Sequence, residues 1–160
     1  MNINIRDSRT APTKAEILAV ENVLGIKINE EFLKFNQRYN GGVPESNIFK
    51  VPPNNESDIA EFLELKSIPQ DAYPIKDEVG KYIIPIAFDS CGNYICISNE
   101  RNDGEIYFWD HELPEGEALT KLAPSFADFL DMVRPFDDSQ ITLEPGQVKS
   151  VWVSPELLKK

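Results

Sequence analysis

Histidine, cysteine and long apolar runs are scarce in this sequence, and their scarcity argues against several kinds of protein. The 160 residues include one histidine, His111, and two cysteines, Cys91 and Cys96, without the C-x-x-C spacing of a metal or redox site. No apolar run approaches the roughly 18 residues that a membrane-spanning helix needs. The first residues lack a basic segment followed by an apolar one, so no signal peptide is predicted. We therefore expect a cytoplasmic protein, with no membrane partner.

The two cysteines leave two possibilities open. Cys91 falls in a predicted turn and Cys96 in a predicted strand, so a disulfide across a hairpin is conceivable. A reducing compartment favours free thiols instead.

The motifs of common catalytic and nucleotide sites are also missing. The chain has no G-x-x-x-x-G-K-[ST] phosphate loop, no G-x-G-x-x-G fingerprint and no G-x-S-x-G elbow. Its basic residues are dispersed rather than interleaved with aromatic residues, which argues against nucleic acid as a partner. A single histidine without further ligands at suitable spacing gives no basis for a zinc site. We expect no cofactor, no metal and no enzymatic activity.

Negative charge is abundant, and it is concentrated in the middle of the chain. The net charge is −11, and residues 53–117, with fifteen acidic and four basic residues, account for all of it. Such a surface can speed the capture of a basic protein partner, or it can simply keep the protein soluble. By charge density alone, the candidates for partner binding are Glu56, Asp58, Glu61, Glu64, Glu100, Asp103 and Glu105.

The N-terminal part of the chain predicts two helices. Thr13 and Glu16 form a capping box, and apolar residues at helical spacing follow until Gly25, so a helix is expected over about 14–24. A second helix is expected to begin after Asn29 and to end at Asn40-Gly41-Gly42, where glycine permits a left-handed backbone. A third helix is predicted to begin at Ser125, because apolar residues recur from Phe126 with helical spacing.

Between these helices the apolar pattern is that of strands. Strands are expected over 47–51, 82–88, 94–98 and 105–109, whereas the segment 58–65 fits neither a helix nor a strand cleanly. The turns between the last three strands are short and polar, which predicts an antiparallel meander. Beyond residue 134 the pattern weakens, with a short strand expected over 150–153 and a brief helix over 155–158. The fold class is α+β: a central, mostly antiparallel sheet flanked by helices.

The segment 104–112, GEIYFWDHE, places the single histidine between two carboxylates. On a strand, alternate side chains point to opposite faces, so Tyr107, Trp109 and His111 form one row and Asp110 lies on the other face with Glu112. If the strand continues through residue 112, His111 therefore cannot converge with either acid. His111 could approach these acids only if the chain turns at Asp110. The row of Tyr107 and Trp109 is covered by a helix or exposed as a binding patch.

Four fragments taken together resemble the SUKH superfamily of Smi/Knr-like domains. They are FLKFNQRYNGGVPE, IIPIAFDSCGNYICIS, GEIYFWDHE and LAPSFADFL, and they occur in the family's order over about residues 13–133. The residues that match the family's signatures are Gly41, Gly42, Asp89, Gly92, Asn93, Trp109, Asp110, His111 and Glu112. We expect one domain over residues 1–160, made of this core and a C-terminal extension, 134–160, to which no family role is assigned.

The resemblance implies the same α+β fold and a function in protein binding, without shared catalytic residues. Many bacterial members resemble immunity proteins that neutralise polymorphic toxins, often nucleases, and the eukaryotic relatives are regulatory interaction proteins. A toxin-neutralising immunity protein with a basic toxin domain as its partner is therefore the leading hypothesis. A regulatory adaptor with an ordinary cellular partner is the second, and a hydrolase-type enzyme using His111 is the third. The oligomeric state stays open.

Overall fold

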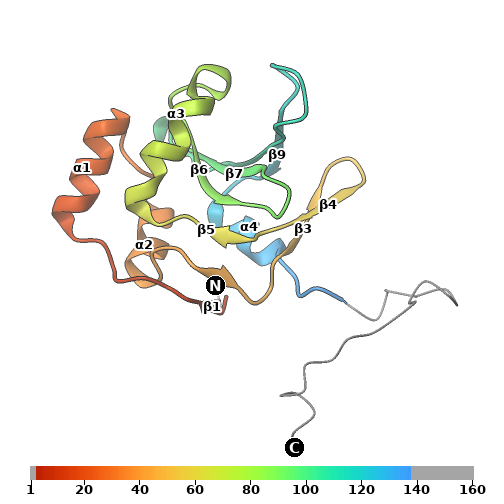
Figure 1. Cartoon of the computed structure of the whole chain (residues 1–160), viewed down its shortest axis with the longest axis horizontal. Coiled ribbons are helices and arrows are strands. Elements are labelled where there is room, and N and C mark those ends of the chain that lie inside the picture. The colour runs from red at the N-terminus through yellow and green to blue at the C-terminus, as the bar shows by residue number, and fades with distance from the viewer. Residues whose placement is uncertain (1–2, 138–160) are drawn as a thin grey trace, which may run out of the picture.

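A five-stranded antiparallel sheet forms the centre of the molecule (Figure 1). The structure is a computed structural model that describes residues 3–137, and the elements predicted over 150–153 and 155–158 lie outside that range. The sheet has the order β5-β6-β7-β8-β9, in which each strand pairs with its neighbours in sequence. Its strands are β5 (Glu61–Phe62), β6 (Ile83–Phe88), β7 (Tyr94–Ser98), β8 (Ile106–Trp109) and β9 (Leu119–Ala123). The predicted meander is confirmed.

Two small strand pairs lie outside this sheet. β1 (Ile5–Arg6) pairs with β2 (Val43–Pro44), and β3 (Ile48–Val51) forms a hairpin with β4 (Asn55–Asp58). The hairpin projects from one side of the molecule in Figure 1. An isolated bridge joins Ile48 to Arg134 and so ties the hairpin to the segment that follows the last helix.

The three predicted helices are present with nearly the expected bounds. They are α1 (Lys14–Leu24), α2 (Glu30–Arg38) and α4 (Phe126–Met132). Thr13 and Glu16 form the predicted capping box, and Asn29 accepts hydrogen bonds from the Glu31 and Phe32 amides at the start of α2. The caps fix where these helices begin because each satisfies amide groups that have no partner inside the helix.

A further helix, α3 (Ile68–Val79), follows the short 3₁₀ turn η1 (Leu65–Ser67) and was not predicted. Its buried residues recur at helical spacing, but two prolines interrupt the sequence pattern. Pro69 stands in the first turn, where an amide proton has no partner in any helix, and Pro74 is exposed. The helix was therefore not predicted because of its prolines, although its apolar face has regular helical spacing. This face consists of Ile68, Ala72, Ile75 and Val79.

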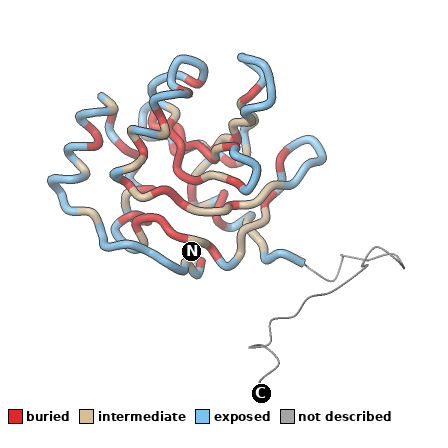
Figure 2. The backbone as a smooth tube through the Cα atoms, in the orientation of Figure 1, coloured by how far each residue is buried: buried red, intermediate tan, exposed pale blue. Residues whose placement is uncertain are grey.

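Helices cover both faces of the sheet. Ile106 and Phe108 of β8 belong to the main core, together with the phenylalanines of α2 and α4. Tyr107 and Trp109 point to the opposite face, where they pack against a smaller cluster containing Ile75 and Val79 of α3. The red segments in Figure 2 mark the main core between the helices and the sheet. Alternation along the strand thus sends neighbouring aromatic residues into different cores.

Polar segments form the other elements that the pattern did not predict. β4 has the sequence Asn-Glu-Ser-Asp, which carries no apolar alternation, and it is a strand because it pairs with β3. The ambiguous segment 58–65 contains the last residue of β4, the two-residue strand β5 and the first residue of η1. β9 is an edge strand of the sheet and its residues are mostly half-buried. The 3₁₀ turn η2 (Glu100–Asn102) lies between β7 and β8.

Candidate functional site

β8 ends at Trp109, in agreement with the strand expected over 105–109, so the condition that the strand continue through residue 112 is not met. The strand stops at Trp109 and the chain turns at Asp110, whose carbonyl accepts a hydrogen bond from the Leu113 amide at 3.2 Å. The loop 110–118 closes where the Asp110 amide donates to the Ala118 carbonyl at 2.9 Å. Strand alternation therefore does not decide where His111 points. Its hydrogen bonds decide the orientation of its ring.

His111 is held by an amide and contacts neither neighbouring acid. Asn93 Oδ1 accepts from the His111 backbone amide at 3.2 Å and lies 2.8 Å from His111 Nδ1. Because an amide oxygen has no proton to give, Nδ1 carries the proton in this contact. Within residues 3–137, no group of three or more histidine, cysteine, aspartate or glutamate residues could hold a metal ion.

The same asparagine joins His111 to a buried aspartate. Asn93 Nδ2 donates to Asp89 Oδ2 at 2.9 Å, and this contact fixes which end of the Asn93 amide faces His111. Asp89 also accepts from Ser57 Oγ at 2.8 Å, from the Cys91 amide at 2.9 Å and from the Asn93 amide at 2.8 Å. A continuous network thus connects β4, the turn between β6 and β7, and the turn after β8.

The network determines the protonation state of Asp89. Burial by itself raises the pKa of this carboxyl, but the hydrogen bonds from Asn93, Ser57 and Cys91 favour the ionised form and together hold the pKa below its ordinary value. Asp89 is therefore a buried carboxylate that organises four donors. This arrangement is suited to fixing the positions of three chain segments, because every oxygen of the carboxylate is occupied by a donor.

Replacing His111 with alanine is expected to lower the free energy of unfolding by about 1 kcal/mol, because one hydrogen bond from Nδ1 is lost. The bond from the His111 backbone amide to Asn93 remains available to the variant. Urea unfolding followed by tryptophan fluorescence measures the change. Glu112→Ala, at the exposed next position, is the control and should change stability by less than about 0.5 kcal/mol. A loss above 3 kcal/mol for His111→Ala would contradict this assignment.

The row formed by Tyr107 and Trp109 faces α3. Both rings pack against the cluster containing Ile75 and Val79, and Trp109 stacks on Tyr94 with ring centroids 5.8 Å apart. A hydrogen bond to Glu105 raises the pKa of Tyr107 to about 12, and burial, with Asp71 nearby, raises the pKa of Tyr94 to about 12. These aromatic residues therefore pack beneath a helix instead of forming an open binding patch.

The cysteines are free thiols in the structure. Cys91 is exposed in the turn after β6, and Cys96 is completely buried in β7. Burial raises the pKa of the Cys96 thiol. Only Cys91 is therefore accessible to reagents.

The seven acidic candidates lie on three segments of the fold. Glu56 and Asp58 lie on β4, Glu61 and Glu64 lie at β5 and just after it, and Glu100, Asp103 and Glu105 lie between β7 and β8. Several are paired within the molecule: Glu61 with Arg9 at 2.7 Å, Glu64 with Lys66 at 3.0 Å, and Glu105 with Lys121. Charge density along the sequence could not reveal the pairings of Glu61 and Glu105, because their partners lie 52 and 16 positions away.

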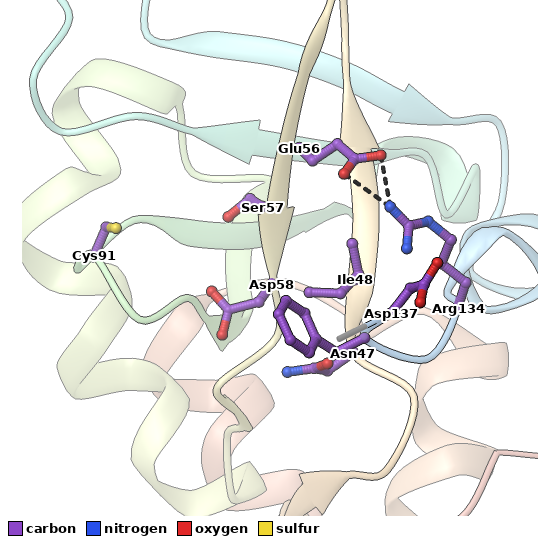
Figure 3. A pocket seen from close by; sticks show the side chains of 9 residues that line it. Asn47, Ile48, Glu56, Ser57, Asp58, Cys91, Arg134 and Asp137 are labelled. Atoms are coloured by element: carbon purple, nitrogen blue, oxygen red, sulfur yellow. Dashed lines mark hydrogen bonds and ion pairs between the residues drawn. The ribbon is translucent and has the colours of Figure 1, made fainter. Parts of the chain in front are cut away.

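Two hollows lie along β4 and share Glu56, Ser57 and Cys91 in their linings. We call them the β4 groove. One hollow, of about 550 Å³, is shown in Figure 3 and contains Asp58 and the ion pair in which Arg134 Nη2 contacts Glu56 at 2.7 Å. The other, of about 440 Å³, lies between the hairpin and the turn after β8. Its apolar lining includes Val51, Pro52, Pro53, Phe108 and Leu113.

The β4 groove is negatively charged. Arg134 is the one basic residue in the described lining of the two hollows, and Glu56 already pairs with it. The acidic residues of the lining are Glu56, Asp58, Asp89, Asp110 and Asp137. The loop 110–118 beside the groove adds three exposed acids: Glu112, Glu115 and Glu117. The acidic excess of residues 53–117 is visible in the sequence, but its position beside β4 is not, because no pattern predicts the β3–β4 hairpin.

The sequence model of the SMI1/KNR4 family (SUKH-1) matches residues 11–132. The chain belongs to the SMI1/KNR4 family. The matched range agrees with the expected SUKH-like core over about 13–133. No curated protein matches the chain. Within residues 3–137, no helix is both long and apolar enough to cross a membrane.

The residues that resemble the SMI1/KNR4 family's signatures have structural roles here. Asp89 and Asn93 form the centre of the buried network, and Asp110 and His111 form the turn that closes the loop 110–118. Gly92, with a φ of 96°, lies in the same turn as Asp89. Gly41 and Gly42 join α2 to β2, where Gly42 exchanges two backbone hydrogen bonds with Phe62 of β5. Of these residues, Asp89, Asn93 and Asp110 line the β4 groove.

Proposed function

We propose that this SMI1/KNR4 family member is a non-enzymatic protein-binding domain that neutralises a basic toxin domain in the cytoplasm. The observation that supports the proposal is the β4 groove, whose lining carries five acids and one already paired base. A nuclease toxin needs a positive surface to hold phosphates, so an acidic groove can occupy the surface that the nucleic acid would use.

The proposed mechanism is steric and electrostatic. The apolar part of the groove supplies contact area, and the acids around it attract a basic partner and orient it during approach. His111 has no catalytic role in this proposal, because its Nδ1 is engaged by Asn93 and neither neighbouring carboxylate contacts its ring. Nucleic acid and membrane are not proposed as partners, because the same charges repel both.

The proposal is tested by isolating the partner from native lysate, identifying it, and measuring its association with purified variants. Charge reversal of Glu112, Glu115 and Glu117 to lysine should slow association at least about tenfold and flatten its dependence on salt. The matched control reverses Asp77, Glu78 and Glu100, which changes the net charge equally at exposed positions away from the groove. Its association should stay within about threefold of the wild type.

Three other results would change the interpretation. Equal losses in both variants would mean that total charge, and not the β4 groove, governs association. No loss in either variant would contradict the electrostatic mechanism. A partner that is an ordinary cellular protein, with no toxic activity when produced alone, would favour the regulatory adaptor.

A further inference from the structure

One arginine of the β4 groove is tied to the β3–β4 hairpin by its backbone. The Arg134 amide donates to the Ile48 carbonyl at 2.9 Å, and the Arg134 carbonyl accepts from the amides of Asn47 and Ile48 at 3.1 and 3.0 Å. These bonds hold the residues that follow α4 against β3. None of them restrains the Arg134 side chain, which can change its partner while its backbone stays in place.

The side chains of Arg134 and Glu56 meet across β3 (Figure 3). Arg134 Nη2 lies 2.7 Å from Oε1 and 2.8 Å from Oε2 of Glu56. A single nitrogen thus contacts both oxygens, whereas the strongest pairs of arginine with a carboxylate use two nitrogens side by side. The two side chains are 41% and 48% exposed, so water screens the pair and it adds little to stability. Another cation can therefore replace Arg134 at Glu56 with little loss.

The hollow around this ion pair has room for a second basic side chain. Its volume of about 550 Å³ is free space that remains with Arg134 in place. Ile48 and Phe136 belong to the lining, and Phe136 is 59% exposed, so apolar surface is available to the stem of an arginine. The acidic residues of the described lining are Glu56, Asp58 and Asp137.

Arg134 reduces the attraction of the β4 groove for a basic partner. Glu56 is the acid that lines both hollows, and its charge is the one that Arg134 offsets. A resident cation repels an incoming cation and must leave Glu56 before the incoming one can make the same contact. When one cation replaces the other, Glu56 is paired before and after binding. No carboxylate is then left unpaired at this point of the interface.

Resting on the function proposed above, we infer that an arginine of the basic partner enters this hollow and takes the place of Arg134 at Glu56. Arg134 is a competitor built into the chain, which weakens association and favours partners whose arginine binds Glu56 better. The planar guanidinium of an incoming arginine can offer two nitrogens to the two oxygens, and a lysine ammonium cannot. The displaced Arg134 side chain turns to water while its backbone stays bound to β3.

A labelled peptide of six arginines tests this competition without the natural partner. Its binding to the full chain is measured by fluorescence anisotropy at about 50 mM salt, where surface charges are screened less than at physiological salt. Arg134→Gln should bind the peptide at least about threefold more tightly than Arg9→Gln does. Arg9→Gln is the matched control, because Arg9 is also 41% exposed and pairs with Glu61 at 2.7 Å, outside the described lining of the groove.

Two further measurements locate the effect at Glu56. In a Glu56→Gln background, Arg134→Gln should no longer increase the affinity, because the contested carboxylate is absent. A peptide of six lysines should gain less from Arg134→Gln than the arginine peptide gains. Equal affinities of Arg134→Gln and Arg9→Gln for the arginine peptide would overturn the inference, as would a gain that persists without Glu56. Equal gains for the two peptides would overturn the assignment of a guanidinium.

The peptide also separates this inference from the proposed function. A lysate partner that is toxic and is neutralised by the chain, together with equal peptide affinities of Arg134→Gln and Arg9→Gln, would overturn the inference and leave the proposed function standing. A tighter complex of the arginine peptide with Arg134→Gln, together with a partner that has no toxic activity, would support the competition at Glu56 and count against the proposed function.

Discussion

Gly42→Ala is expected to lower the free energy of unfolding by about 3 kcal/mol or more. Two effects add at this position. Gly42 has a φ of 107°, a conformation that is strained for any residue with a Cβ. A Cβ atom there would also lie 2.5 Å from the Arg6 carbonyl oxygen and 2.8 Å from Ile5 Cγ2, so that β1 would have to move. Urea denaturation followed by circular dichroism measures the loss.

Gly25→Ala is the matched control for this prediction. Gly25 also has a positive φ, of 67°, but a Cβ added to it meets nothing within 4 Å. The control should therefore lose only about 1 kcal/mol, the usual penalty for a left-handed residue other than glycine. Similar losses in the two variants would mean that the close approach of β1 to Gly42 contributes nothing to stability.

The second large effect is expected from Asp89→Ala, which should lower the free energy of unfolding by about 3 kcal/mol at neutral pH. The substitution leaves the donors from Ser57, Cys91 and Asn93 without their shared acceptor in a buried site. Asp58→Ala is the control, because Asp58 accepts two hydrogen bonds from Ser90 at the surface. Its loss should be below about 1 kcal/mol, since water can replace the carboxylate.

The effect of Asp89 should also depend on pH. The pKa of its carboxyl is lower in the folded protein than in the unfolded chain, so its contribution is complete above the unfolded pKa of about 3.9. The contribution is then lost as the pH falls through the folded pKa, because the unfolded chain binds the proton more readily. The difference in stability between wild type and Asp89→Ala should therefore shrink below about pH 4. A difference that stays constant to pH 2 would contradict the assigned protonation state.

The sequence predicted the elements that local chemistry determines. The capping box at Thr13 and Glu16, the Asn29 cap and the polar turns between apolar strands act over a few residues, so their patterns are readable without the fold. The sequence did not predict α3, whose prolines interrupt its pattern, or β4, whose polar residues form a strand only through pairing with β3. Pairing between strands decided only the second case.

The candidate site could be predicted only in part. The acidic excess and the residues around Asp89 and His111 were visible in the sequence, but their arrangement depends on contacts between distant segments. Glu56 pairs with Arg134 across 78 positions, and Ser57 reaches Asp89 across 32. The argument from strand alternation does not apply to His111, because a turn at Asp110 ends the strand at Trp109 and the loop closes at Ala118.

The network around Asp89 also affects how much conformational entropy this protein loses when a partner binds. The loop 110–118 is anchored at its base by two contacts, His111 with Asn93 and Asp110 with Ala118, and the hairpin is anchored by Ser57 with Asp89. Both walls of the β4 groove are therefore positioned before any partner arrives. Association then needs to order fewer backbone dihedrals and side-chain rotamers, so more of the contact energy is retained as affinity.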